Sequence, residues 1–262
     1  MWLRYLDTTL AELRKFYINN CWKSIEHWEY DMPTKALTSF SHKYSLELDI
    51  TPEIDTDDTR LCQAWVQILL WAVELGRLNI HLEVSLISSH VANHRRWYLK
   101  EILHIFADLK KRNKLTIAFN PRHPSIDEEI SIDCNWKDFY PDAQKAIPNN
   151  LPKPRGKDVS ITCFVDAFHT NNLKTWRPNT GILIYINCAP IIWYSKRYNT
   201  VESRTFGSEF TALKTVIEIL IRLRFKLRCF EIPIDGSSNA MYDNKAVTKK
   251  CPHSSIHTTE EA

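Results

Sequence analysis

The sequence predicts an α/β chain in which a small, mainly helical region precedes a mixed sheet with the order strand, strand, strand, helix, strand, helix. Two observations lead to this prediction. In the first half, apolar residues recur every three or four positions, as on an amphipathic helix. After a segment rich in Pro, Asp and Asn, short apolar runs bounded by turn residues follow, as in β-strands.

The first half divides into three segments. Residues 1–58 are predicted to form an N-terminal helix and a polar connector, because an apolar helical period gives way to prolines and acidic residues. Residues 59–119 are predicted to be helical, and the run LCQAWVQILLWAVELG ends at Gly76, a residue typical of the position after a helix. Residues 120–157 are rich in Pro, Asp and Asn and are predicted to be a linker.

The second half contains the predicted sheet, in residues 158–250, followed by a divergent tail over 251–262. The predicted elements are strands at Ser160–Asp166, Thr180–Asn187, Pro190–Tyr194 and Asn239–Asp243, a long helix at Arg204–Arg228, and a helix from Asn244 onward. The turn between the second and third strands is predicted at Cys188-Ala189.

Three acidic residues lie at distinctive points of this pattern. Asp166 ends the apolar run ITCFVDA, Glu209 lies near the start of the long helix, and Asp243 ends the run NAMYD. Carboxylate oxygens are the ligands that Mg²⁺ and Mn²⁺ prefer, and two such ions can activate a water and stabilise the leaving oxygen of a phosphodiester. The three residues are therefore predicted to be both metal ligands and catalytic residues.

Each acid also has an ordinary structural explanation when it is taken alone. Asp166 is a common turn residue, Asp243 could cap a helix, and Glu209 could be an exposed charge favoured by the helix dipole. The catalytic interpretation depends on the three occurring together.

Composition excludes some functions and favours a polyanionic partner. Neither G-x-x-x-x-G-K nor G-x-G-x-x-G occurs, which argues against a nucleotide hydrolase with a P-loop and against a dinucleotide enzyme. Residues 151–262 carry 16 Lys and Arg against 10 Asp and Glu. A basic surface around an acidic site suits nucleic acid, although this excess of positive charge is also ordinary for a segment of this length.

Cysteine usage and hydropathy predict an intracellular protein of the cytoplasm or nucleus. The seven Cys are irregularly spaced and form no C-x-x-C, so reduced thiols are expected. The N-terminal residues lack the apolar core of a signal peptide, and the apolar runs are too short to span a membrane. The sequence does not determine an oligomeric state.

Three long sequence segments resemble a known family. FVDAFHTNNLKTWRPNTGILIYIN, APIIWYSKRYNTVESRTFGSEFTALK and IPIDGSSNAMYDNKAV resemble the ribonuclease H region in the C-terminal part of the Pol polyprotein of copia-type LTR retrotransposons. The upstream run beginning WVQILLWAVELGRLNIHLEV resembles the connection region of the reverse transcriptase in the same polyproteins. The resemblance covers roughly residues 32–247 and implies a ribonuclease H-like fold for 158–250.

The resemblance also implies an activity and roles for individual residues. The activity is hydrolysis of RNA in RNA–DNA hybrids with Mg²⁺ or Mn²⁺, with Asp166, Glu209 and Asp243 as the metal-binding carboxylates. Residues expected near the nucleic acid are Lys196, Arg197, Thr180, Ser208 and Asn244.

Departures from the family text lower the expected activity. Phe168 replaces a second acid, and the sequence after Val247 lacks the family's His-containing segment and a later Asp. We therefore expect an incomplete two-metal site, in a truncated ribonuclease H domain with weak or lost activity. The polymerase signature Y-x-D-D is absent, so no polymerase site is expected. The alternatives are a non-catalytic nucleic-acid-binding module and a non-functional relic of the element.

Overall fold

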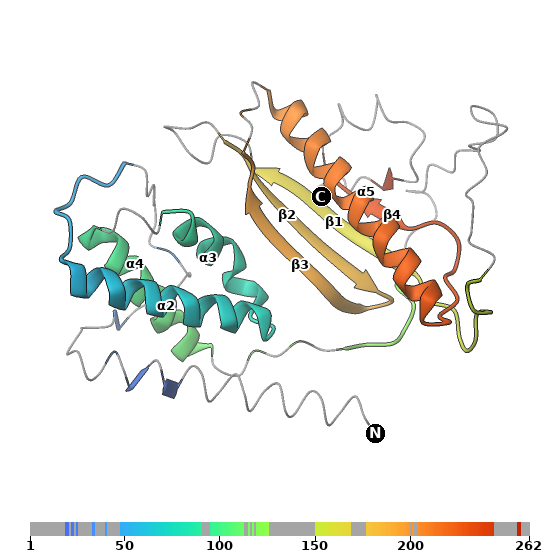
Figure 1. The fold of residues 1–262 in the computed structure, drawn as a ribbon, viewed down its shortest axis with the longest axis horizontal. Helices are drawn as coiled ribbons and strands as arrows, with labels where there is room; N and C mark the ends of the chain where they lie inside the picture. The colour runs from blue at the N-terminus through green and yellow to red at the C-terminus, as the bar shows by residue number, and fades with distance from the viewer. Residues whose placement is uncertain are drawn as a thin grey trace. The chain divides into compact units, whose positions relative to one another are not determined.

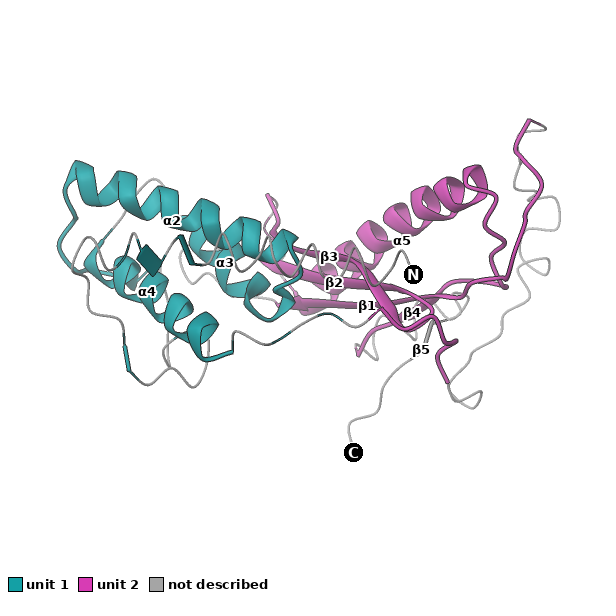
Figure 2. Ribbon diagram, turned by 90° about the horizontal axis from the view of Figure 1, so that it is seen from below, with its two compact units in different colours: residues 1–117, 172–174 teal, residues 118–171, 175–262 magenta. Residues whose placement is uncertain are grey.

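The chain forms two compact units, residues 1–117 with 172–174 and residues 118–171 with 175–262 (Figure 2). In a computed structural model of the chain, the described residues are 48–90, 95–112, 119–125, 150–168, 177–199, 204–243 and 256–257, with single positions at 19, 20, 22, 23, 25, 33, 34, 40, 115, 117 and 201. The division after residue 117 assigns the described parts of the predicted linker to the second unit.

The first unit is helical over its described elements. It contains α2 (Thr56–Glu74), a short 3-10 helix η2 (Leu78–Ile80), α3 (His81–Ser88) and α4 (Arg96–Lys111). Asp55 caps α2 by accepting a hydrogen bond from the backbone N–H of Asp58 at 2.7 Å. The rings of Trp65 on α2 and Phe106 on α4 meet edge to face with centroids 6.4 Å apart, and both side chains are buried.

The predicted helix end at Gly76 is confirmed. After the last residue of α2, the N–H of Gly76 donates to the carbonyl of Val73 at 2.9 Å, and the N–H of Arg77 donates to the carbonyl of Ala72 at 3.0 Å. This pair of bonds satisfies carbonyls that a helix end leaves without partners. It requires a left-handed residue, and Gly76 has φ of 100°.

The second unit is built on a mixed five-stranded sheet in the order β3-β2-β1-β4-β5 (Figure 1). Its strands are β1 (Ile161–Phe168), β2 (Asn179–Ile186), β3 (Ala189–Arg197), β4 (Asn239–Met241) and β5 (Ile256–His257). β1, β2 and β3 pair antiparallel in sequence order, whereas β4 is parallel to β1 and β5 is parallel to β4.

The long helix α5 (Thr205–Cys229) covers one face of this sheet. The core between them is made of alternate strand residues and one side of the helix: Ile161, Cys163, Val165, Ala167, Ile182, Ile184, Ala212, Leu213, Val216 and Leu220. The opposite face, called here the open face, carries Phe164, Asp166 and Phe168 of β1. Among the described residues of this unit, no helix covers the open face.

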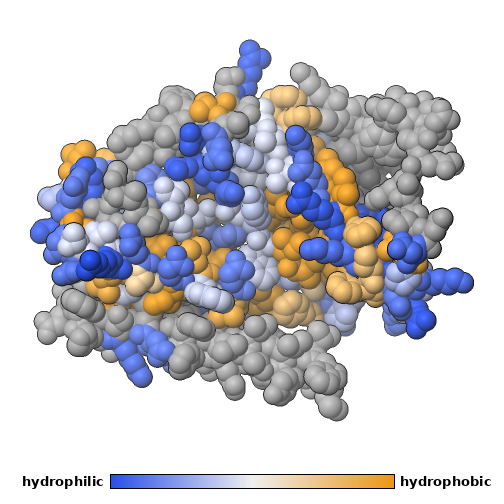
Figure 3. Space-filling view, viewed as in Figure 1, coloured by the Kyte–Doolittle hydropathy of each residue, from blue (hydrophilic) through white to orange (hydrophobic). Residues whose placement is uncertain are grey.

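The outer side of α5 also carries apolar residues. Phe210, Ile217, Ile221 and Phe225 are exposed there, and the space-filling view shows apolar and hydrophilic side chains side by side along the helix (Figure 3). Phe206 and Phe210 stack with their ring centroids 5.9 Å apart. The helix is therefore apolar on more than the side that faces the sheet.

The mixed α/β architecture agrees with the sequence prediction, and β1 to β4 each lie within a few residues of a predicted strand. The predicted turn at Cys188-Ala189 is wrong by one or two residues, because Asn187 takes the left-handed conformation with φ of 54° and β3 already begins at Ala189. The segment predicted as a tail contributes β5 to the sheet. Most of the predicted N-terminal helix and the helix predicted from Asn244 lie outside the described residues.

Within the described part of the chain, no helix has both the length and the apolar character needed to span a membrane.

We predict that Gly76→Ala lowers the free energy of unfolding by about 1–2 kcal/mol, because an L-residue is strained in the left-handed conformation. The added Cβ would also lie 2.7 Å from Cδ1 of Ile117. Urea denaturation followed by circular dichroism measures the effect. Gly181→Ala is the control, because Gly181 does not have this φ and its Cβ would meet nothing within 4 Å. Equal stability of the two variants would contradict the assignment.

Candidate metal centre

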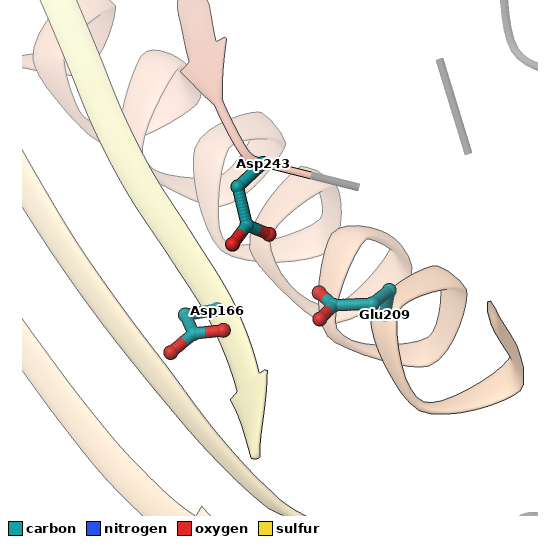
Figure 4. Close-up of side chains that lie close together, drawn as sticks. All are labelled: Asp166, Glu209 and Asp243. Carbon is teal, nitrogen blue, oxygen red and sulfur yellow. The ribbon is translucent and has the colours of Figure 1, made fainter. Parts of the chain in front are cut away.

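Three carboxylates meet where two parallel strands end beside the start of α5. Asp166 lies near the end of β1, Asp243 lies two residues beyond β4, and Glu209 is in the second turn of α5 (Figure 4). One oxygen from each side chain can be chosen so that all three lie within 4.8 Å of one another. The three acids predicted from the sequence are therefore brought together.

Strand pairing and helix packing place these side chains. Cys163, Val165 and Ala167 of β1 are buried against α5, so the alternation of a strand turns Asp166 to the open face. β4 pairs with β1 up to Met241 opposite Phe164, and two further residues bring Asp243 level with Asp166.

Glu209 approaches the site from the helix. It lies one turn before Ala212 and Leu213, which pack on the sheet, so its side chain is on the same side of α5. This placement leaves Glu209 only 6% exposed, whereas Asp166 and Asp243 are exposed.

Burial and mutual repulsion raise the pKa of two of the three carboxyl groups. The pKa of Glu209 rises to about 7, first because burial removes solvent and then because Asp166 and Asp243 are negatively charged. The pKa of Asp166 rises for the same reasons, with Asp243 as its charged neighbour. A hydrogen bond donated by the backbone N–H of Ala167 partly offsets both shifts.

The donor set fits a hard divalent cation. All three groups offer oxygen, and none of the ion pairs found among the described residues involves them. Two ligands on opposite sides of Mg²⁺ are separated by about 4.2 Å, so oxygens within 4.8 Å need only a small rotation to coordinate one ion. A cation here would relieve the repulsion that raises the pKa of Glu209.

Lys196 and Arg197, both expected near nucleic acid, lie on opposite faces of the sheet. Lys196 is exposed but pairs with Thr180, on the face of the sheet that α5 covers. Arg197 is partly exposed and belongs to the open face, in register with Asn179, which pairs with Phe168. Only Arg197 of these two basic residues therefore shares a sheet face with Asp166.

Thr180 and Ser208 are buried, so their side chains do not face solvent where a nucleic acid would bind. The hydroxyl of Tyr198 lies beside Thr180 and is 3.2 Å from Oγ1 of Thr215, on the α5 side of the sheet. Burial is the main reason that the pKa of Tyr198 is raised, and the charge of Glu209 adds to it. Asn244 lies outside the described residues.

Two features of the site were missed by sequence reasoning. Tyr198 and Thr215 form a polar group next to Glu209, and no motif in the sequence identifies it. Gly181 pairs directly with Asp166, and a Cβ added there would meet nothing within 4 Å. There is thus open space beside the Asp166 carboxylate on the open face. The predicted strand pattern could have indicated this neighbour only if the register had been known.

Comparisons with known proteins returned no match among family models, curated proteins or solved structures.

We predict that Mn²⁺ and Mg²⁺ affinity falls as the pH drops from 8 to 6. A proton on Glu209 competes with the cation below its pKa of about 7, so affinity should fall roughly tenfold per pH unit there. Isothermal titration calorimetry in buffers of different ionisation enthalpy measures both the affinity and the protons released. An affinity that is constant across this range would contradict a role for Glu209 as a ligand.

We predict that Glu209→Gln stabilises the metal-free protein at pH 8. The folded-state pKa of about 7 exceeds the ordinary value of 4.5, so ionised Glu209 costs folding free energy above pH 7. The cost is relieved as the pH falls through this window and is absent below 4.5. We expect a gain of about 1–3 kcal/mol at pH 8 and none near pH 4.

Urea denaturation in a chelator at both pH values measures this gain. Glu218→Gln, at an exposed position of the same helix, is the matched control and should be neutral at both. If the two variants behaved alike, Glu209 would not be under the repulsion described above.

Proposed function

We propose that the second unit hydrolyses phosphodiester bonds of nucleic acid with a divalent cation, and that its substrate is the RNA strand of RNA–DNA hybrids. The gathering of Asp166, Glu209 and Asp243 at the ends of β1 and β4 carries this proposal. The mixed sheet and the element order support a ribonuclease H-like domain. With the strings that resemble the copia-type Pol polyprotein, they favour a piece of such a polyprotein.

The reaction needs no side-chain nucleophile. The oxygen of a water molecule forms a bond to phosphorus, and the bond from phosphorus to the leaving ribose oxygen breaks. The water loses a proton and the leaving oxygen gains one, so charge and atoms balance. A divalent cation held by the three carboxylates would acidify a bound water and offset negative charge on the phosphate.

The protein's own carboxylates would position the phosphate and hold or release a proton. Asp166 and Asp243 are exposed and can face the phosphate, whereas Glu209 is held from behind by α5. Because the pKa of Glu209 is about 7, its carboxyl holds a proton for part of the time at neutral pH and releases it when a cation enters. Packing of α5 on β1 fixes the distance between these groups.

A non-catalytic nucleic-acid-binding module is the second candidate, together with a relic of the element without function. The cluster among the described residues contains three carboxylates, one fewer than the resemblance implies for a full two-metal site. Fewer ligands weaken the hold on a second ion, and a two-metal mechanism uses that ion to stabilise one of the two reacting oxygens. This observation favours weak activity and keeps the binding module as the rival.

We predict that the purified chain cleaves a labelled RNA–DNA hybrid slowly in Mg²⁺ or Mn²⁺ and not in a chelator. Asp166→Asn should reduce the rate by more than about 100-fold, because even outer-shell partners of a metal ligand contribute 10- to 100-fold. Glu218→Gln, which keeps the same helix and changes an exposed carboxylate, should cleave at the rate of the unaltered chain.

Two results would contradict the proposal. Equal cleavage by Asp166→Asn and the unaltered chain would point to a contaminating nuclease. Failure of a folded chain to cleave at any metal concentration would leave the binding module or the relic.

A further inference from the structure

Phe168 is an exposed aromatic side chain next to the carboxylates. It lies two residues after Asp166 on β1, so both side chains project from the open face, roughly 7 Å apart along the strand. Phe168 is 57% exposed, and it makes no ring contact with other aromatic residues of the described part of the chain. A large apolar ring left open to water beside a charged site is a costly arrangement that a bound ligand would relieve.

The other exposed phenylalanine of β1 differs from Phe168. Phe164 lies on the opposite side of Asp166 and is 43% exposed, but its ring packs edge to face on Tyr185 with centroids 5.9 Å apart. Part of the Phe164 ring surface is therefore already covered by Tyr185 of the same sheet. Among the described residues, Phe168 is the one of the pair whose ring makes no such contact.

The space around Asp166 on the open face can admit a ligand. Gly181 is the cross-strand partner of Asp166, and the position where its Cβ would lie is empty to 4 Å. A group seated against Phe168 would therefore meet no side chain of β2 next to Asp166, although Asn179 lies opposite Phe168 itself. Arg197 lies in the same register row as Phe168, two strands away, so positive charge is also present on this face.

We propose that Phe168 stacks on an unpaired nucleobase and thereby directs the carboxylate site to nucleic acid that has an unpaired nucleotide beside the bond to be cleaved. This rests on the proposed function and narrows its substrate to hybrids in which a nucleotide next to the cleaved bond is unpaired. In a nucleotide the anionic phosphate and the flat base are separated by the sugar, which suits the roughly 7 Å between Asp166 and Phe168 along the strand. In a continuous duplex the base faces are already stacked on each other, so Phe168 gains nothing there.

The test measures binding separately from cleavage. The probe is a short single-stranded RNA with one 2-aminopurine, whose fluorescence is quenched when the base stacks, and the same RNA annealed to complementary DNA. The full chain is titrated in a chelator and in Ca²⁺. We expect quenching and tighter binding for the single strand than for the hybrid.

Substitutions identify the ring responsible. Phe168→Ala should abolish the quenching and weaken single-strand binding by roughly 5- to 100-fold, the range for one aromatic–base stack. Phe168→Trp should retain both. Phe230→Ala is the matched control, since Phe230 is 72% exposed but lies just beyond the far end of α5, about 30 Å along the helix from Glu209. Gly181→Leu fills the open space and should weaken binding with Phe168 intact.

Unchanged quenching and affinity in Phe168→Ala would overturn the proposal, as would equal losses in Phe168→Ala and Phe230→Ala. Preferred binding of the fully paired hybrid would overturn it too. Failure of the stacking inference can be distinguished from failure of the proposed hydrolysis. Phe168-dependent quenching without any cleavage would keep this inference and remove the enzyme, whereas Phe168-independent cleavage of the paired hybrid would do the reverse.

Discussion

The second unit depends on holding three negative groups together, and none of the ion pairs among the described residues supplies a positive side chain to them. Apolar packing of α5 on β1 does this, because Ala212, Leu213 and Val216 fix the helix while Glu209 follows it into the site. The repulsion is visible in the pKa of Glu209, which rises to about 7. Burial of Glu209 beside Asp166 and Asp243 therefore carries an electrostatic cost, which a divalent cation bound to the three carboxylates would remove.

This arrangement explains why the sheet has two different faces. The face against α5 is largely apolar and closed, and Thr180 is buried on it. The open face presents Asp166 with Phe168 beside it and empty space over Gly181. The proposed catalysis and recognition would thus use the open face, while the packing that stabilises the unit is on the face against α5.

The order of strands and helix in the second unit and the three clustered acids could be predicted from the sequence. Strand-end acids after apolar runs and an acid near a helix start mark Asp166, Asp243 and Glu209, because elements of that order bring their ends to one edge. Which basic residue shares the face of Asp166 could not be predicted, since it depends on register. A bulge between β2 and β3 at Ile184/Tyr185 shifts the pairing by one residue and decides that it is Arg197.

The most direct test of the account is anomalous diffraction from crystals of the intact chain grown with Mn²⁺ above pH 7.5. We expect a manganese peak bounded by the carboxylates of Asp166, Glu209 and Asp243, with Phe168 solvent-exposed beside it. An ordered site with the three carboxylates free of manganese, or neutralised by Lys or Arg side chains, would contradict it.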